Sequence, residues 1–148
     1  MIAAVTDASS SAILVDTSAW VEYDRATGSA IDWRLRDLIG REGPVAVTEA
    51  IVMEVLAGAR TDDREIDLRR MLLRFRLLPL EPSVDFEGAA TIYRRCRGVG
   101  VTPRGLVDCL IASVAARTGA SLLSADVDLA RVADVIGLAL DPASVRPS

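Results

Sequence analysis

A chain of 148 residues with 51% hydrophobic content can bury one apolar core but has no room for a second domain. The sequence contains no histidine, and all of its 17 basic residues are arginine, which excludes histidine-bound zinc, Ser-His-Asp triads and a P-loop lysine. The carboxylates remain as the candidate acids, bases and metal ligands.

The net charge of −4 disfavours a polyanionic partner, although arginines gather at 69–76 and 94–104. No apolar run reaches the roughly 18 residues of a membrane span. The N-terminus also lacks the basic start and long apolar stretch of a signal peptide, so we expect a cytoplasmic protein. Cys96 and Cys109 lie in helical apolar patterns and are expected to be reduced core residues.

The pattern of apolar residues predicts strands that alternate with helices. Residues 1–11 are small and polar and predict a flexible extension before one domain over 12–148. In chain order we predict a strand at 12–15, helices at 17–23 and 29–39, a strand at 44–47, helices at 48–58 and 62–75, a strand ending near Pro79, helices at 82–97 and 106–117, a strand at 121–124, a helix at 126–136 and a candidate edge strand at 138–140. This alternation predicts a three-layer α/β/α fold with a mainly parallel central sheet.

Two acidic residues follow predicted strands, where the functional crevice of such a sheet lies. Asp16 comes directly after the first strand, and Asp126 follows the strand at 121–124. Aspartate at a strand end also commonly caps the next helix. Each residue therefore has both a functional and a capping interpretation.

Two other acids lie on apolar helix faces. Glu54 is surrounded by valine, methionine, leucine and small residues, and Asp108 lies within Leu106-Val107-Asp108-Cys109-Leu110-Ile111. An ionised carboxylate on such a face is costly unless it is paired or bound to a metal. A metal site and a salt bridge to arginine are the two interpretations.

Four short motifs surround these acids and resemble those of a known family. They are Val15-Asp16-Thr17-Ser18-Ala19-Trp20, Glu54-Val55-Leu56-Ala57-Gly58, Leu106-Val107-Asp108-Cys109-Leu110-Ile111-Ala112 and Leu123-Ser124-Ala125-Asp126-Val127-Asp128-Leu129. In this order and at these separations, the sequence resembles the PIN-domain nucleases, specifically the VapC-type toxins. It departs from their usual pattern at Leu129, where an aromatic residue is common, at Ser124, where threonine is frequent, and in its longer N-terminal extension.

The resemblance implies an endoribonuclease with a PIN-like fold. It implies that Asp16, Glu54, Asp108 and Asp126 converge on Mg²⁺ or Mn²⁺, supported by Ser124, Thr17 and Ser18. Residues two apart on a helix face different ways, so Asp126 and Asp128 are alternatives for the fourth acid, and Asp126 is preferred by its place in the motif. Clustered carboxylates repel one another, so at least one should have a raised pKa.

The resemblance also implies partners: an RNA substrate, a cognate VapB-type antitoxin whose tail lies across the active-site groove, and a second copy in a homodimer. Trp20, Tyr23 and Trp33 are candidates for that groove or dimer face, and core packing is their alternative. Two other functions stay open, an inactive PIN-like binding module and a carboxylate-based phosphohydrolase acting on small molecules. The missing lysine argues against the second of these.

Overall fold

The computed structural model describes residues 11–147, so the predicted N-terminal extension lies, apart from Ser11, outside the described residues. Within this part of the chain the structure has four strands and seven helices. They are β1 (Ile13–Val15), α2 (Thr17–Asp24), α3 (Ala30–Gly40), β2 (Val45–Val47), α4 (Glu49–Ala57), α5 (Asp62–Leu72), β3 (Arg76–Leu77), α6 (Pro82–Gly98), α7 (Leu106–Thr118), β4 (Ser121–Leu123) and α8 (Val127–Ile136).

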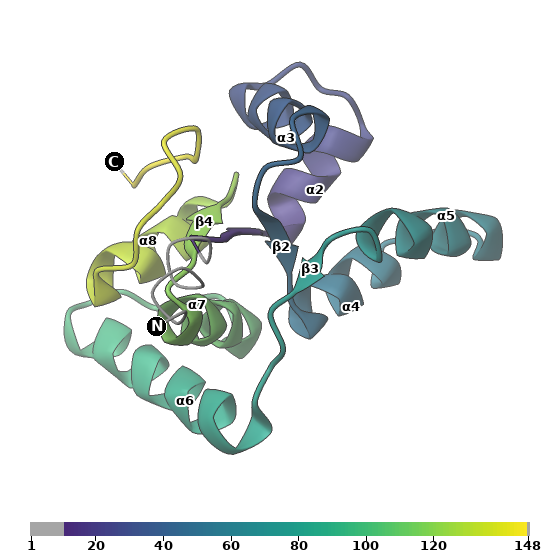
Figure 1. Cartoon of the computed structure of the whole chain (residues 1–148). Helices are drawn as coiled ribbons and strands as arrows, with labels where there is room; N and C mark the ends of the chain where they lie inside the picture. Colours follow the sequence, from purple (N-terminus) through teal and green to yellow (C-terminus); the bar gives the residue numbers. More distant parts are fainter. Residues whose placement is uncertain (1–10, 148) are drawn as a thin grey trace, which may run out of the picture.

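The four strands form one parallel sheet in the order β3-β2-β1-β4. The central strand β1 is buried along its whole length because it has a neighbour on each side and helices on both faces. Figure 1 shows α6 and α7 below the sheet and α2 and α3 above it. The predicted three-layer α/β/α arrangement with a parallel sheet is confirmed.

The main differences from the predicted elements lie at the two edges of the sheet. Helix α5 ends at Leu72 rather than at Phe75, because Phe75 packs against Trp20, with ring centroids 5.2 Å apart, in the turn that leads into β3. The candidate edge strand at 138–140 is reduced to a single bridge between Leu122 and Leu140. The chain leaves this edge at Asp141, whose buried carboxylate pairs with Arg34.

The apolar side chains form two packed groups. The larger group surrounds the sheet, and Trp20, at 1% exposure, belongs to it, which confirms core packing for that residue. The smaller group joins α6, α7 and α8 and contains Cys96 and Cys109, which are both buried and free, as predicted. No helix in the described part of the chain is long and apolar enough to cross a membrane.

A buried ion pair fastens α6 to α7. The Asp85 carboxylate is fully buried and accepts hydrogen bonds from Arg117 Nη2 at 2.7 Å and from Ser113 Oγ at 2.8 Å. Burial raises the pKa of Asp85, but the hydrogen bonds from Arg117, from the Glu81 backbone and from Ser113 outweigh burial and hold that pKa below its ordinary value. The carboxylate is therefore ionised in the folded protein at neutral pH.

We predict that Arg117→Met destabilises the fold by about 3 kcal/mol, because it leaves the Asp85 charge buried without its partner. Arg69→Met is the control, since Arg69 makes an exposed pair with Glu65 whose loss should cost less than about 1 kcal/mol. Urea unfolding of both variants measures the difference. Equal losses would show that the α6–α7 pair contributes no more than a surface pair.

Candidate active site

A cavity of about 440 Å³ opens beside the carboxyl ends of β1 and β4, where a parallel α/β sheet presents its functional crevice. All four acids singled out from the sequence line this cavity. Its lining consists of Asp16, Thr17, Ser18, Glu54, Arg104, Gly105, Val107, Asp108 and Asp126. The acids come from the end of β1, from α4, from the first turn of α7 and from the end of β4, so the fold brings together residues up to 110 positions apart.

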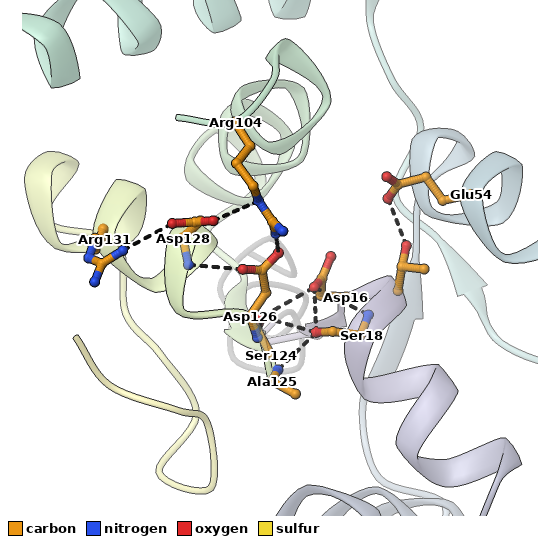
Figure 2. Close-up of polar contacts among 10 residues, drawn as sticks. Asp16, Ser18, Glu54, Arg104, Ser124, Ala125, Asp126, Asp128 and Arg131 are labelled. Carbon is orange, nitrogen blue, oxygen red and sulfur yellow. Dashed lines mark hydrogen bonds and ion pairs between the residues drawn. The ribbon is translucent and has the colours of Figure 1, made fainter. Parts of the chain in front are cut away.

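Asp16 is a helix cap and a cavity residue at once. Its Oδ2 atom accepts hydrogen bonds from Ser18 Oγ at 2.7 Å, from Ser124 Oγ at 3.2 Å and from Ser18 N at 3.4 Å (Figure 2). Figure 2 shows the other carboxylate oxygen turned away from these donors, towards the space between Arg104 and Glu54. Burial raises the pKa of Asp16 although the hydrogen bonds oppose that shift. Capping and a place in the site are therefore compatible.

Hydroxyl groups hold the two strand ends together and orient the acids. Ser18 Oγ accepts from the Ala125 backbone N at 2.9 Å, and Ser124 Oγ accepts from the Asp126 backbone N at 3.0 Å. Thr17 Oγ1 donates to Glu54 Oε1 at 2.7 Å. The three residues predicted as supporting groups thus each contact an acid of the cavity, either through a side chain or through its backbone.

Asp108 and Glu54 make no ion pair with any arginine in the described part of the chain, which removes the salt-bridge interpretation for both. Burial raises the pKa of Asp108 to about 7, and the negative charges of Asp126, Asp16 and Glu54 add to that shift while Arg104 opposes it. The expectation that one clustered carboxylate has a raised pKa is confirmed. The repulsion also shows that the four acids share one electrostatic environment.

Arg104 neutralises part of this charge from the rim of the cavity. Its Nη2 atom pairs with Asp126 Oδ2, and its Nε atom lies 2.6 Å from Asp128 Oδ2 (Figure 2). The prediction that Asp126 and Asp128 face different ways was wrong. Asp126 is the N-cap of α8 and has extended backbone angles, so the spacing rule for residues within a helix does not apply to it.

Sequence reasoning placed Arg104 in a surface arginine cluster and missed its contact with the acids. The available signal was its position two residues before α7, whose first turn carries Asp108. A cation beside the first turn of a helix is unfavourable for the helix dipole unless acids compensate it. Asp126 and Asp128 supply that compensation through space.

The donor chemistry of the cavity fits a hard divalent cation, because carboxylate and hydroxyl oxygens are the ligands that Mg²⁺ and Mn²⁺ prefer. Within residues 11–147, however, no three acidic side chains are arranged as ligands of a single ion. Asp126 Oδ2 is paired with Arg104, and Asp126 Oδ1 accepts from the Asp128 backbone N at 2.9 Å. A cation that binds Asp126 must therefore compete with Arg104.

Comparisons with known proteins agree with this geometry. Residues 13–135 match the model of the PIN domain. Ribonuclease VapC11 of Mycobacterium tuberculosis and VapC ribonuclease Mb1587 of Mycobacterium bovis are each 42% identical over 127 residues, which is 85% of this chain and 95% of each relative. The VapBC2 complex of Rickettsia felis, solved with a DNA fragment from its promoter, contains a chain with the same fold, with a TM-score of 0.70 and 14% identity over 90% of this chain and 98% of that one.

The match over residues 13–135 makes this chain a member of the PIN-domain family, whose ribonucleases generally depend on a divalent metal. Within that family it belongs to the VapC ribonucleases.

We predict that Asp108 makes the metal-free protein less stable as pH rises. Between its ordinary value of 3.8 and its folded value of about 7, the folded state holds a proton that the unfolded chain has lost. The free energy of unfolding therefore falls across this window. From pH 5 to pH 8 in EDTA, the wild type should lose about 2.6 kcal/mol more than Asp108→Asn, which has no proton to lose. Parallel profiles for the two proteins would contradict the raised pKa.

We also predict that Arg104→Gln tightens the binding of Mn²⁺ several-fold, because it removes the cation that competes for Asp126. Isothermal titration calorimetry measures the dissociation constant directly. Arg131→Gln is the matched control, since Arg131 pairs with Asp128 on the outer side of α8. Weaker binding in Arg104→Gln than in this control would show that Arg104 supports the cation instead of competing with it.

Proposed function

We propose that this protein is an endoribonuclease toxin that hydrolyses RNA phosphodiesters in the cytoplasm with carboxylate-bound Mg²⁺ or Mn²⁺, and that a cognate VapB-type antitoxin neutralises it. The observation that carries the proposal is the cavity in which Asp16, Glu54, Asp108 and Asp126 share one electrostatic environment. Without a cation such a cluster only destabilises the fold. A site that must bind a cation to relieve this repulsion is suited to act on a charged phosphate.

The four acids have different roles in binding the cation and the attacking water. Asp16, Asp108 and Asp126 hold the cation, and Glu54 binds it or orients the attacking water. When bound, such a cation lowers the pKa of a coordinated water and stabilises negative charge on the reacting phosphate. Hydrolysis by water leaves a 5′-phosphate and a 3′-hydroxyl.

The hydroxyl groups keep the acids in position for these roles. Ser18 and Ser124 fix one oxygen of Asp16, which leaves its other oxygen available to the cavity. Thr17 fixes one oxygen of Glu54 in the same way. No histidine or lysine is present to act as a base, so the acids and the cation they hold carry the chemistry.

A second hollow supports the proposed antitoxin partner. It has a volume of about 280 Å³, lies between α2, α4 and α5, and shares Thr17 and Glu54 with the acid cavity. Its lining includes the apolar residues Trp20, Val21 and Val55. An extended peptide with an apolar side chain would fill this hollow. An arginine on the same peptide would then reach the acids.

We predict that Asp16→Asn lowers metal-dependent RNA cleavage by about 100-fold or more, because the variant loses a charged ligand at nearly constant shape. Induced expression of the wild type without its antitoxin should slow growth, and Asp16→Asn should relieve that effect. Asp134→Asn removes an exposed acid of α8 that does not line the cavity and is the control. Gel analysis of labelled RNA and growth curves provide the two measurements.

Three results would contradict the proposal. Cleavage that persists in excess EDTA, or fragments that end in a 2′,3′-cyclic phosphate, would refute metal-assisted hydrolysis. Normal growth with soluble wild-type protein would refute the toxin. RNA binding without cleavage in Mg²⁺ and in Mn²⁺ would favour the inactive binding module.

A further inference from the structure

A shallow hollow of about 440 Å³ adjoins the acid cavity on the side of α6. Its lining comes from one face of α6 and from the start of α7: Ala90, Tyr93, Arg94, Arg97, Gly105 and Leu106. Gly105 also lines the acid cavity, so the two depressions are neighbours on the surface. Arg104, the residue before Gly105, lines the acid cavity.

The hollow is basic, whereas the cavity beside it is acidic. Arg94 and Arg97 line it, no acid does, and neither arginine pairs with an acid among the described residues. Arg104, by contrast, is compensated by Asp126 and Asp128. The two arginines of α6 therefore present positive charge that the described part of the protein does not neutralise.

The hollow also presents flat and apolar surfaces. The Arg97 guanidinium carbon lies over the Tyr93 ring, 5.6 Å from its centre, in a cation–π contact. Tyr93 is partly buried and packs against the core that joins α6, α7 and α8, which holds the ring in place. Leu106 is 56% exposed beside them. A guanidinium supported by an aromatic ring, next to an exposed leucine, is a surface on which an unpaired base can stack.

The charge of the acid cavity explains why a polyanion needs such a surface. RNA phosphates are repelled by the four acids, and the chain as a whole carries a net charge of −4. Binding must therefore come from uncompensated cations close to the reacting bond. The hollow between α2, α4 and α5 also contains arginines without an ion pair among the described residues, Arg25 and Arg60, but the acids Asp24 and Glu54 line it too. The hollow on α6 has arginines in its lining and no acid.

We propose that the α6 hollow binds the single-stranded RNA next to the bond that is cut. Arg94 and Arg97 contact backbone phosphates, and one base stacks on the surface formed by Arg97, Tyr93 and Leu106. This assignment rests on the proposed ribonuclease function. Double-stranded RNA does not fit the assignment, because its bases are already stacked and paired.

The test measures RNA binding apart from cleavage. Fluorescence anisotropy with a labelled single-stranded oligonucleotide is followed against NaCl concentration in the Asp16→Asn background, which prevents cleavage. We expect Arg94→Gln/Arg97→Gln to weaken binding about 10-fold or more at low salt. The slope of log affinity against log salt should fall by about 1.4, at about 0.7 for each phosphate that the variant no longer neutralises.

Matched variants separate this effect from a general change in charge. Arg69→Gln/Arg70→Gln removes the same two charges from α5 and should bind within about two-fold of the parent. Arg94→Lys/Arg97→Lys keeps both charges and should restore the salt slope. Tyr93→Leu keeps the packing against the core and should weaken binding about 5-fold or more, because a base can no longer stack there. With Asp16 intact, the Arg94→Gln/Arg97→Gln change should raise KM more than it lowers kcat.

Three other outcomes would overturn either the RNA-binding assignment or the proposed function. If the α6 and α5 double variants lose affinity equally, or if neither loses any, the assignment is overturned. If the α6 variant instead changes only the oligomeric state in light scattering, the hollow is a contact between two copies of this chain. If RNA binds through Arg94 and Arg97 but the wild type never cleaves it with either metal, the proposed function fails while the RNA-binding surface stands.

Discussion

The pairing of β1 with β4 in parallel is the constraint on which the site depends. Val15 lies opposite Leu123 in the register, so the residues that follow the two strands emerge side by side. Asp16 and Ser124 meet there, and Ser18 joins them through its hydroxyl group. A strand placed elsewhere in the sheet would leave Asp16 alone at the end of β1. The hydroxyl network is therefore a consequence of strand order, and it fixes the position of one acid before any cation arrives.

The second feature of the site is electrostatic repulsion between its carboxylates. Four carboxylates line one cavity, and of these only Asp126 has an arginine partner among the described residues. Asp16 and Glu54 are held by hydroxyl groups, which orient a carboxylate without cancelling its charge. Burial raises the pKa of Asp108 to about 7, and the remaining repulsion from the other three acids adds to that shift. The protein thus gives up stability at this edge of the sheet, as functional sites commonly do, and α6 and α7 are fastened elsewhere by the buried Asp85 pair.

The complete replacement of lysine by arginine gives the surface a particular character. Guanidinium groups bind carboxylates and phosphates through fixed forks and also stack on aromatic rings. Arg104 shows the first behaviour with two acids, and Arg97 shows the second over Tyr93. The same residue type therefore serves as a counter-ion at the rim of the cavity and as an uncompensated cation beside it. Arg104 and Arg97 have the same chemistry and differ in role only because their surroundings differ.

The sequence by itself determined the fold class, all seven helices of the described part of the chain and the four acids. Apolar periodicity and strand-helix alternation are local properties, and a carboxylate on an apolar helix face, such as Glu54 or Asp108, is conspicuous because its burial is costly. The bounds of the short β3 strand were not predictable in this way, because two exposed residues are too few to show an alternation of apolar and polar side chains.

Tertiary structure decided which charged groups pair and neutralise one another. The contact of Arg104 with Asp126 and Asp128 spans 22 residues or more, and no local pattern encodes it. The exposure of Trp33 against the burial of Trp20 was likewise settled by packing, because both lie in helices that contain apolar residues. The basic hollow on α6 follows the same rule: periodicity places Tyr93, Arg94 and Arg97 on one face, but only the fold sets that face beside the acids, because the loop before α7 brings Gly105 against both.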